Sequence, residues 1–318
     1  MFRPGRYAAL DIGTVTCRML VADVDGQGRL SELDREYRIA NLGEGVDASG
    51  LLKPEAMERV AGVLKGYLQI LEGFVEPGGE RPRLRAVATS AARDAKNSAD
   101  FEAMLGELGI PLSIVSGEEE ARLGFRGASC DFSGEPLLVA DIGGGSTEIV
   151  AGRAGQKPDF ATSFNIGCRR MTEKFLASDP PTASEIEAAR AWARGMMAPF
   201  FEQLRAAGYE GRRLVAVAGT ATTIVSIRDG MEVYDASRVH LARVERAELD
   251  AVHEQLRAAP LEQRRRIVGL DPGRAPIIVA GTIILQTVLD LAGADSFTAS
   301  ESDILQGIVL DLAERAAR

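Results

Sequence analysis

The chain of 318 residues has few of the side chains that build several common kinds of site. It has two histidines, His240 and His253, which excludes a histidine-rich metal centre and a phosphohydrolase built on a His-Asp cluster. It has three cysteines, an odd number without a Cys-x-x-Cys spacing. Reduced thiols in a cytoplasmic protein are therefore the simplest interpretation.

The sequence also lacks long apolar runs and an excess of positive charge. No run reaches the length of a membrane span, and Met1-Phe-Arg-Pro leads directly into a predicted strand, so we expect neither a signal peptide nor a transmembrane anchor. The formal net charge of −9 argues against a general nucleic-acid-binding protein, so a polyanionic ligand would have to meet a local basic lining. The length and the 46% of hydrophobic residues predict two domains of ordinary size.

A glycine-rich turn in residues 137–150 is the most informative stretch that the sequence does contain. Apolar residues lead into Asp141, three glycines and two hydroxyl residues follow, and a β-branched run then restarts, which predicts strand, turn and strand. Glycines let successive backbone amides approach an anion, and a carboxylate beside bound phosphate suits a bridging Mg²⁺ ion. A P-loop does not fit, because no Gly-Lys-Ser/Thr follows. An ordinary glycine hairpin explains this turn equally well when it is taken alone.

The same unit occurs again at the N-terminus. Residues 7–14 end in Asp11-Ile-Gly-Thr and lead into a second apolar strand from Cys17, and Asp11 precedes Asp141 by 130 residues. Two copies at a domain-sized separation predict two similar halves that face each other across a phosphate-binding cleft. The repetition favours phosphate chemistry over two coincidental hairpins.

Two stretches supply candidate charged groups for the first half. Arg93 follows a predicted strand at 84–89, so it would project at the carboxyl end of the sheet, where its guanidinium can grip phosphate. The alternative is a solvated arginine on a helix. Ser116 and Glu119 predict a capping box at a helix start, in which the carboxylate reaches back to the cap. Glu120 has no such structural explanation and is a candidate base for a water molecule.

Two further stretches belong to the second half. Gly219 and Thr220 follow a third predicted strand, and the backbone amides of a helix that begins there would add an anion-binding wall. Arg169 and Arg170 either line a path for a polyanion or cap the helix that follows them.

Six motifs, in order along the chain, resemble those of the exopolyphosphatase and guanosine-pentaphosphate phosphatase family. They are residues 11–14 (DIGT), 88–97 (ATSAARDAKN), 116–123 (SGEEEARL), 141–148 (DIGGGSTE), 218–223 (AGTATT) and 274–281 (RAPIIVAG). The resemblance to the short bacterial form implies a duplicated α/β fold of the actin-like and sugar-kinase-like ATPase type, which is ribonuclease H-like, with two domains around a central cleft. Residues 1–124 with 303–318 would form the first domain and 125–302 the second.

The resemblance also implies the activity, which is hydrolysis of the terminal phosphate of inorganic polyphosphate, processive or distributive, by Mg²⁺-assisted in-line attack of water. Mn²⁺ is the alternative metal. The implied catalytic residues are Glu120, Asp141, Glu148 and Asp11, of which Asp11, Asp141 and Glu148 would hold the metal. The implied substrate-binding residues are Thr14, Arg18, Arg93, Gly143, Gly144, Gly145, Ser146, Gly219 and Thr220.

Other partners and activities follow from the same resemblance. One alternative is a 5′-phosphatase acting on guanosine pentaphosphate, with guanosine tetraphosphate as a related ligand, and another is a non-catalytic sensor of polyphosphate or of these nucleotides. A homodimer in the cytoplasm is expected, with neither nucleic acid nor membrane as a partner. Two positions depart from the family pattern, because Val15 stands where asparagine is usual and Gln306 where arginine is common.

Overall fold

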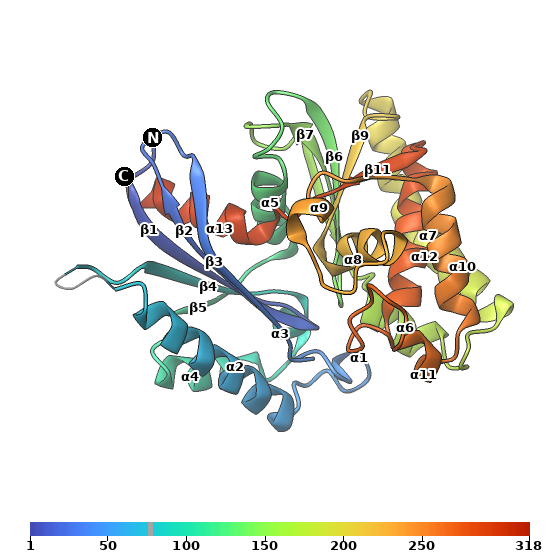
Figure 1. Ribbon diagram of the computed structural model, residues 1–318, viewed down its shortest axis with the longest axis horizontal. Coiled ribbons are helices and arrows are strands. Elements are labelled where there is room, and N and C mark those ends of the chain that lie inside the picture. Colours follow the sequence, from blue (N-terminus) through green and yellow to red (C-terminus); the bar gives the residue numbers. More distant parts are fainter. Residues whose placement is uncertain (76–78) are drawn as a thin grey trace. The chain divides into compact units, whose positions relative to one another are not determined.

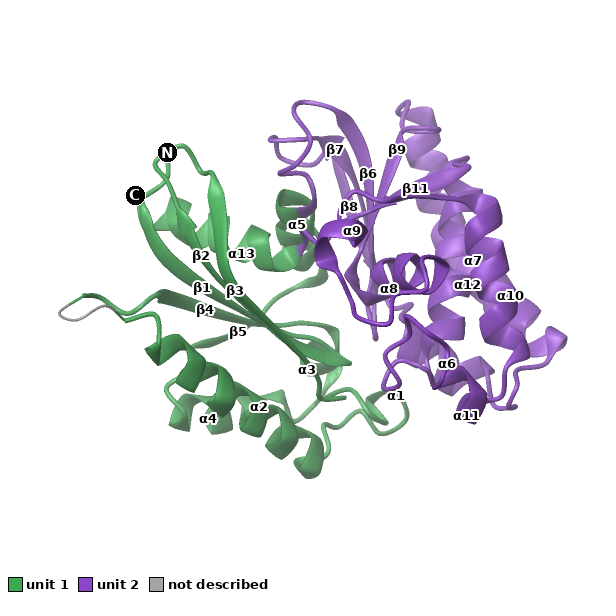
Figure 2. Cartoon of the chain, in the orientation of Figure 1, with its two compact units in different colours: residues 1–127, 304–318 green, residues 128–303 purple. Residues whose placement is uncertain are grey.

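The computed structural model describes residues 1–75 and 79–318, which divide into two compact units. Unit 1 comprises Met1–Gly127 with Ile304–Arg318, and unit 2 comprises Ala128–Asp303 (Figure 2). Each unit is a mixed α/β body built on one sheet (Figure 1). The last segment of the chain therefore returns to unit 1 after unit 2 is complete.

The sheet of unit 1 has five strands in the order β3-β2-β1-β4-β5. Its strands are β1 (Gly5–Ile12), β2 (Thr16–Val24), β3 (Leu30–Ile39), β4 (Arg83–Ala88) and β5 (Leu112–Ile114). The first three form an antiparallel meander, and β4 and β5 continue the sheet in parallel with β1. The helices of unit 1 are α1 (Val46–Ser49), α2 (Pro54–Glu72), α3 (Ser90–Asp94), α4 (Ser98–Glu107), α5 (Gly117–Ala128) and α13 (Ile304–Arg315).

Both faces of this sheet are buried, which explains why β1 is apolar at almost every position. Ala8 and Leu10 belong to a core that includes residues of α2 and α4, whereas Tyr7 and Ala9 belong to a second core that includes residues of α13. Figure 1 shows these helices on opposite faces of the sheet. Successive side chains of a strand point to opposite faces, so a strand covered on both sides needs apolar residues at both alternations.

The sheet of unit 2 has six strands in the order β10-β11-β9-β6-β7-β8. Its strands are β6 (Pro136–Ile142), β7 (Thr147–Arg153), β8 (Phe160–Phe164), β9 (Arg213–Val217), β10 (Arg243–Glu245) and β11 (Ser296–Ala299). Strands β6, β7 and β8 are antiparallel, and β9 and β11 continue in parallel with β6. This arrangement repeats that of unit 1, with β10 as an additional edge strand, so the duplication predicted from the two Asp-Ile-Gly stretches is confirmed.

One helix of unit 2, α12, is almost fully buried, and α6, α7, α8 and α10 pack against it. The helices of this unit are α6 (Cys168–Phe175), α7 (Ala183–Ala206), α8 (Ala218–Arg228), α9 (Ala236–Val239), α10 (Arg246–Ala258), α11 (Leu261–Arg264) and α12 (Ile278–Ala292). Gly281 of α12 faces the start of α8, and a Cβ atom added to Gly281 would lie 2.6 Å from Oγ1 of Thr220. A glycine is therefore required for this close packing. Within the described residues, we find no helix with the length and apolarity needed to cross a membrane.

A buried histidine joins α10 to α12. The hydroxyl of Thr282 donates to the Val279 carbonyl at 2.8 Å, so it accepts from Nδ1–H of His253 at 2.7 Å. This pattern places a proton on Nδ1. Burial lowers the pKa of His253 to about 4, with a contribution from Arg190 and Arg257. The neutral form is therefore the one compatible with the fold.

Acidification should weaken unit 2 through His253. Because its pKa is lower in the folded than in the unfolded chain, its contribution to stability is complete above the ordinary value of 6.5 and is lost as the pH falls towards 4. We expect the free energy of unfolding to fall between pH 7 and pH 5 by about 2 kcal/mol more in the wild type than in His253→Asn. Urea unfolding at the two pH values measures this difference, and an equal fall in both proteins would contradict it.

Candidate active site

The two units carry the same hairpin with different charges. Asp11 and Asp141 each precede an Ile-Gly pair, and the glycine amide then donates across the turn, at 2.9 Å to the Thr16 carbonyl and at 3.0 Å to the Ser146 carbonyl. The residue opposite Asp11 on the neighbouring strand is Arg18, and the residue opposite Asp141 is Glu148. Equivalent positions of one backbone design therefore hold an ion pair in unit 1 and two carboxylates in unit 2.

In unit 1 the predicted residues Asp11 and Arg18 bond to each other. Arg18 donates to Oδ2 of the buried Asp11 through Nη2 at 2.6 Å and through Nε at 3.0 Å. The predicted Thr14 lies in the turn between them, where its carbonyl accepts from the Gly43 amide at 2.8 Å. A Cβ atom on Gly43 would lie 2.3 Å from Cγ2 of Thr14. The loop at Gly43 therefore fixes the position of the turn.

Arg93 and Glu120 form the second pair of unit 1. Arg93 lies on α3, immediately after β4, and its Nη1 donates to Oε2 of Glu120 at 2.7 Å and to the Val115 carbonyl at 3.2 Å. Among the described residues, its Nε and Nη2 make no hydrogen bond, so this edge of the guanidinium can receive a phosphate in a bidentate way. Glu120 is buried in the first turn of α5.

The electrostatic surroundings of Glu120 suit a base near neutral pH. Burial raises the pKa of its carboxyl to about 7, while the Arg93 guanidinium limits the rise. The Asp11 carboxylate contributes to this rise in the pKa, whereas a hydrogen bond from Thr89 opposes it. A carboxylate that ionises near pH 7 combines a sizeable deprotonated fraction with useful basicity.

The capping box predicted at the start of α5 is only half formed. The Glu119 amide donates to Oγ of Ser116 at 3.2 Å, as predicted. The Glu119 carboxylate instead accepts from Nε and Nη2 of Arg122 at 2.7 and 2.8 Å. The prediction that this carboxylate reaches back to the cap was wrong, because an arginine three residues further on offers a charged, two-pronged donor.

In unit 2, three polar side chains occupy one row across three strands. Asp141 in β6 lies opposite Glu148 in β7, and Glu148 lies opposite Ser163 in β8. Directly opposed residues have Cβ atoms about 4.5–5.5 Å apart and share a face of the sheet. The Ser163 hydroxyl donates to Oε1 of the buried Glu148 at 2.6 Å. This bond orients the Glu148 carboxylate.

The glycine turn of unit 2 presents its amides on one edge. The carbonyls of Gly143–Gly145 point towards the start of α6. Their donors are the backbone amides of Cys168 and Arg169 and the Nε of Arg170, each at 2.9 Å. In a trans peptide the N–H points away from the preceding C=O, so the amides of Gly144, Gly145 and Ser146 face away from α6. These three residues belong to the predicted cradle, whereas the amide of Gly143, which was predicted with them, donates to the Ser146 carbonyl within the turn. Arg170, whose role the sequence left open, holds the turn through the Gly145 carbonyl.

Gly219 and Thr220 begin α8 directly beyond β9. Because β9 pairs in parallel with β6 and brings Val217 opposite Asp141, this helix start lies at the same sheet end as the carboxylate pair. A Cβ atom on Gly219 would lie 1.7 Å from Nη1 of Arg274. Only glycine allows that guanidinium to lie against the backbone here.

The predicted metal ligands fall in different units. Asp11 belongs to unit 1, whereas Asp141 and Glu148 belong to unit 2. The described part of the chain contains no group of three or more histidine, cysteine or acidic side chains arranged to hold a metal. Nevertheless, carboxylate oxygens are the donors that hard cations prefer, and two of them face each other in unit 2. The donor chemistry of this pair therefore fits Mg²⁺.

A family model described as the Ppx/GppA phosphatase family matches residues 20–316. The chain belongs to this family. Exopolyphosphatase 2 of Mycobacterium tuberculosis is 40% identical, over 97% of this chain and 98% of that protein. A solved exopolyphosphatase-like protein is 33% identical with a TM-score of 0.89 and covers 99% of this chain and 100% of its own. The Ppx/GppA enzyme of Aquifex aeolicus is 27% identical with a TM-score of 0.79, over 97% of this chain and 99% of that one.

The Ppx/GppA match confirms the family that was predicted from the six motifs. The solved Ppx/GppA structures have the actin-like ATPase fold, so the predicted fold class is confirmed as well. Membership places the chain among phosphatases. The roles of individual residues stay predictions, and they rest on the geometry described above.

Sequence reasoning missed two side chains beside the predicted groups. Ser163 lies in a strand whose sequence, FATSF, carries no motif, and only the register of β8 against β7 brings it to Glu148. Arg274 was noticed only as part of a motif, and its contact with Gly219 depends on the packing of the segment before α12. A glycine that follows a buried strand was the single signal that another group approaches closely there.

Neutralising Glu148 should stabilise the metal-free protein. Two like charges directly opposite each other in a sheet are destabilising, so Glu148→Gln removes a repulsion while keeping an acceptor for Ser163. We expect the melting temperature of Glu148→Gln in the presence of a chelator to exceed that of the wild type by a few degrees, corresponding to about 1 kcal/mol. Calorimetry in EDTA measures this, and a lower melting temperature would show that the carboxylate is not under repulsion.

Proposed function

We propose that the protein is an exopolyphosphatase, which hydrolyses the terminal phosphoanhydride bond of inorganic polyphosphate. The observation that carries this proposal is the repeated hairpin with two different charge pairs. The copy in unit 1 places one arginine beside one carboxylate, and the copy in unit 2 places two carboxylates beside an amide turn, which suits a phosphate accompanied by a cation. The Arg93–Glu120 pair, outside the hairpin of unit 1, adds groups that suit phosphate binding and water activation. The 40% identity to Exopolyphosphatase 2 supports this choice of substrate.

Unit 1 would supply the base and a binding arginine. Glu120 accepts a proton from the attacking water, and Arg93 offers its Nε–Nη2 edge to oxygens of the terminal phosphate. When that phosphate binds, Arg93 shares its charge between the substrate and Glu120. Arg18, held by Asp11, adds a second positive group, and the Thr14 turn is the equivalent of the glycine turn.

Unit 2 would supply the groups that offset the charge of the transition state. The amides of Gly144, Gly145 and Ser146 bind phosphate oxygens, with Gly219 and Thr220 as a second wall. Asp141 and Glu148 would hold Mg²⁺, or Mn²⁺ as the alternative, and Asp11 as a further ligand stays a prediction. When bound, the cation neutralises negative charge on the equatorial phosphate oxygens. Positioning and electrostatics suffice for phosphoryl transfer, so no covalent nucleophile is required.

The finer features of the proposal follow the family. We infer that the protein acts in the cytoplasm and assembles as a homodimer. A 5′-phosphatase acting on guanosine pentaphosphate shares the same motifs, and it is the alternative that the family name itself carries. A sensor without turnover is a third outcome, against which the paired Glu120 and Arg93 argue.

Phosphate release by the purified protein with Mg²⁺ tests the proposal. We expect kcat/KM for polyphosphate to exceed that for guanosine pentaphosphate and ATP. Glu120→Ala should lower kcat on the order of 10²- to 10⁴-fold, because a general base is lost, while the affinity for substrate changes little. Preferred hydrolysis of guanosine pentaphosphate would select the alternative, and binding without release from any substrate would select the sensor.

The pH profile should report the Glu120–Arg93 pair. Since the base acts as a carboxylate, kcat/KM should fall as the pH drops below about 7, the value to which burial raises the pKa of Glu120. Arg93→Ala removes the cation that favours the ionised form, so the acid limb should move to higher pH, and KM should also rise. An acid limb that stays in place in Arg93→Ala would contradict the pairing.

A further inference from the structure

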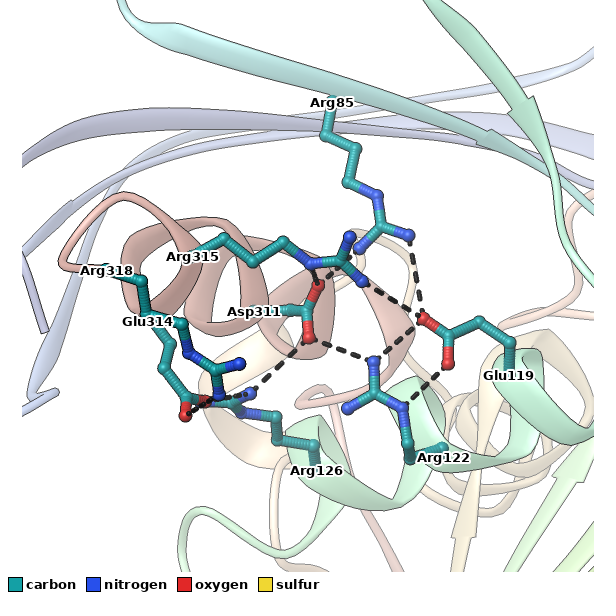
Figure 3. Close-up of polar contacts among 8 residues, drawn as sticks. All are labelled: Arg85, Glu119, Arg122, Arg126, Asp311, Glu314, Arg315 and Arg318. Atoms are coloured by element: carbon teal, nitrogen blue, oxygen red, sulfur yellow. Dashed lines mark hydrogen bonds and ion pairs between the residues drawn. The ribbon is translucent and has the colours of Figure 1, made fainter. Parts of the chain in front are cut away.

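A cluster of charged side chains lies at the junction of β4, α5 and α13, all within unit 1 (Figure 3). It contains five arginines and three carboxylates, which are Arg85, Arg122, Arg126, Arg315, Arg318, Asp311, Glu119 and Glu314. Its centre is Asp311, which is 6% exposed. Neither the sequence motifs nor the proposed chemistry explains why a carboxylate is buried in this position.

Asp311 joins three separate elements. Its Oδ2 accepts from Nη1 of Arg85 in β4 and from Nε of Arg315 in α13, both at 2.6 Å. Its Oδ1 accepts from Nη2 of Arg122 in α5 at 2.9 Å, and Nη1 of Arg126 lies at 3.6 Å. Burial alone raises the pKa of Asp311, but the Arg122, Arg315 and Arg85 guanidiniums hold it below its ordinary value. The carboxylate is therefore ionised, and its charge is distributed over four guanidiniums.

The cluster grips one particular face of α5. Glu119, Arg122 and Arg126 are three and four residues apart, a spacing that places them on one side of the helix. Arg122 bonds both Asp311 and Glu119, and Glu119 also lies 3.6 Å from Arg85 and 3.7 Å from Arg315. Glu120 is the next residue, about 100° further around the helix. The direction in which the face with Glu119, Arg122 and Arg126 is held thus determines where the Glu120 side chain points.

A second contact fixes the distance between the two helices. A Cβ atom on Gly307 of α13 would lie 1.9 Å from the carbonyl oxygen of Leu123, so the backbones of α13 and α5 touch there. Leu123 also belongs to the apolar core that includes residues of α13, and such apolar packing is not directional. The directional bonds of the cluster add a restriction on the rotation of α5 about its axis. Buried ion pairs contribute such orientational specificity more readily than net stability.

We propose that Asp311 is a positioning residue for the reaction, because its guanidinium cluster sets the rotation of α5 and thereby the approach of Glu120 to Arg93. This inference rests on the proposed role of Glu120 as the base. The cluster does not touch the reacting atoms. It acts through Arg122 and Glu119 of α5, so that α13 contributes to the position of the Glu120 side chain.

Steady-state kinetics on polyphosphate test the proposal with Asp311→Asn, which keeps the shape and removes the charge. A shift of a base by about 1 Å can lower the rate about a hundredfold, so we expect kcat to fall between about tenfold and a hundredfold. KM should stay within about twofold, because Arg93 and the amide turns still bind substrate. Asp311→Glu, which restores the charge, should recover part of the lost kcat.

Val309→Ala is the matched control for lost stability. Val309 is a buried residue of the apolar core on the same helix and belongs to no ion pair of the cluster. We expect it to lower the melting temperature while kcat stays within about twofold of the wild type. The proposal would be overturned if Asp311→Asn, Val309→Ala and the wild type had equal kcat values. It would also be overturned if Val309→Ala lost as much kcat as Asp311→Asn at the same melting temperature.

Two further arms keep the test decisive. If Asp311→Asn does not fold, Glu119→Gln replaces it in the kinetic test. A lower kcat of Glu119→Gln at an unchanged melting temperature would support the proposal. An unchanged kcat would overturn it. Hydrogen exchange of the α5 amides, faster in the variant than in the control, tests the grip without any activity. If the wild type released no phosphate, the proposed exopolyphosphatase activity would be wrong. Hydrogen exchange of the α5 amides would still show whether the cluster holds α5 in place.

Discussion

The opposition of two carboxylates across neighbouring strands, Asp141 and Glu148, is the constraint on which the rest of the site depends. Like charges in this arrangement repel each other, and the repulsion grows as the surroundings exclude water. A divalent cation converts the repulsion into binding energy. The hydroxyl of Ser163 bonds Glu148, and the glycine turn follows Asp141 directly along the chain, so a phosphate bound at the turn as proposed would lie close to the carboxylate pair.

In unit 1 the equivalent aspartate is paired with a positive charge instead of a second negative one. At the position equivalent to Glu148 it has Arg18, which neutralises Asp11 directly. Because its hairpin carries its own countercharge, this unit can offer arginines to an anion rather than carboxylates to a cation. One duplicated backbone design therefore carries two different charge pairs, and the difference arises from a single position in the second strand.

Burial tunes the remaining carboxylate for chemistry. A buried glutamate without a cation would be protonated at neutral pH, and a fully exposed one would be a weak base. Arg93 moderates the effect of burial on Glu120, so its pKa lies near the pH at which the protein is expected to work. Helix α5, which carries Glu120, begins with one half of a capping box. The Glu119 carboxylate does not complete that box and instead belongs to the cluster around Asp311.

The sequence predicted the family, the duplicated fold and most of the strands, because these follow from local patterns such as an apolar run that ends in Asp-Ile-Gly. It also predicted which carboxylates lie beside a glycine turn. The partners that depend on tertiary pairing could not be predicted. Ser163 reaches Glu148 only through strand register, and Arg122 bonds Asp311 across 189 residues of chain. Helical spacing indicates which residues share a face, but not which distant helix that face meets.

Binding of Mn²⁺, followed by electron paramagnetic resonance in the presence of inorganic phosphate, tests the central claim most directly. Titration of the wild type and of Glu148→Gln compares two proteins that differ by one charge at the carboxylate pair. The account predicts that the wild type binds the ion and that Glu148→Gln weakens binding by more than about tenfold, since a ligand is lost. Equal affinity in the two proteins would contradict the account and would move the cation away from this pair.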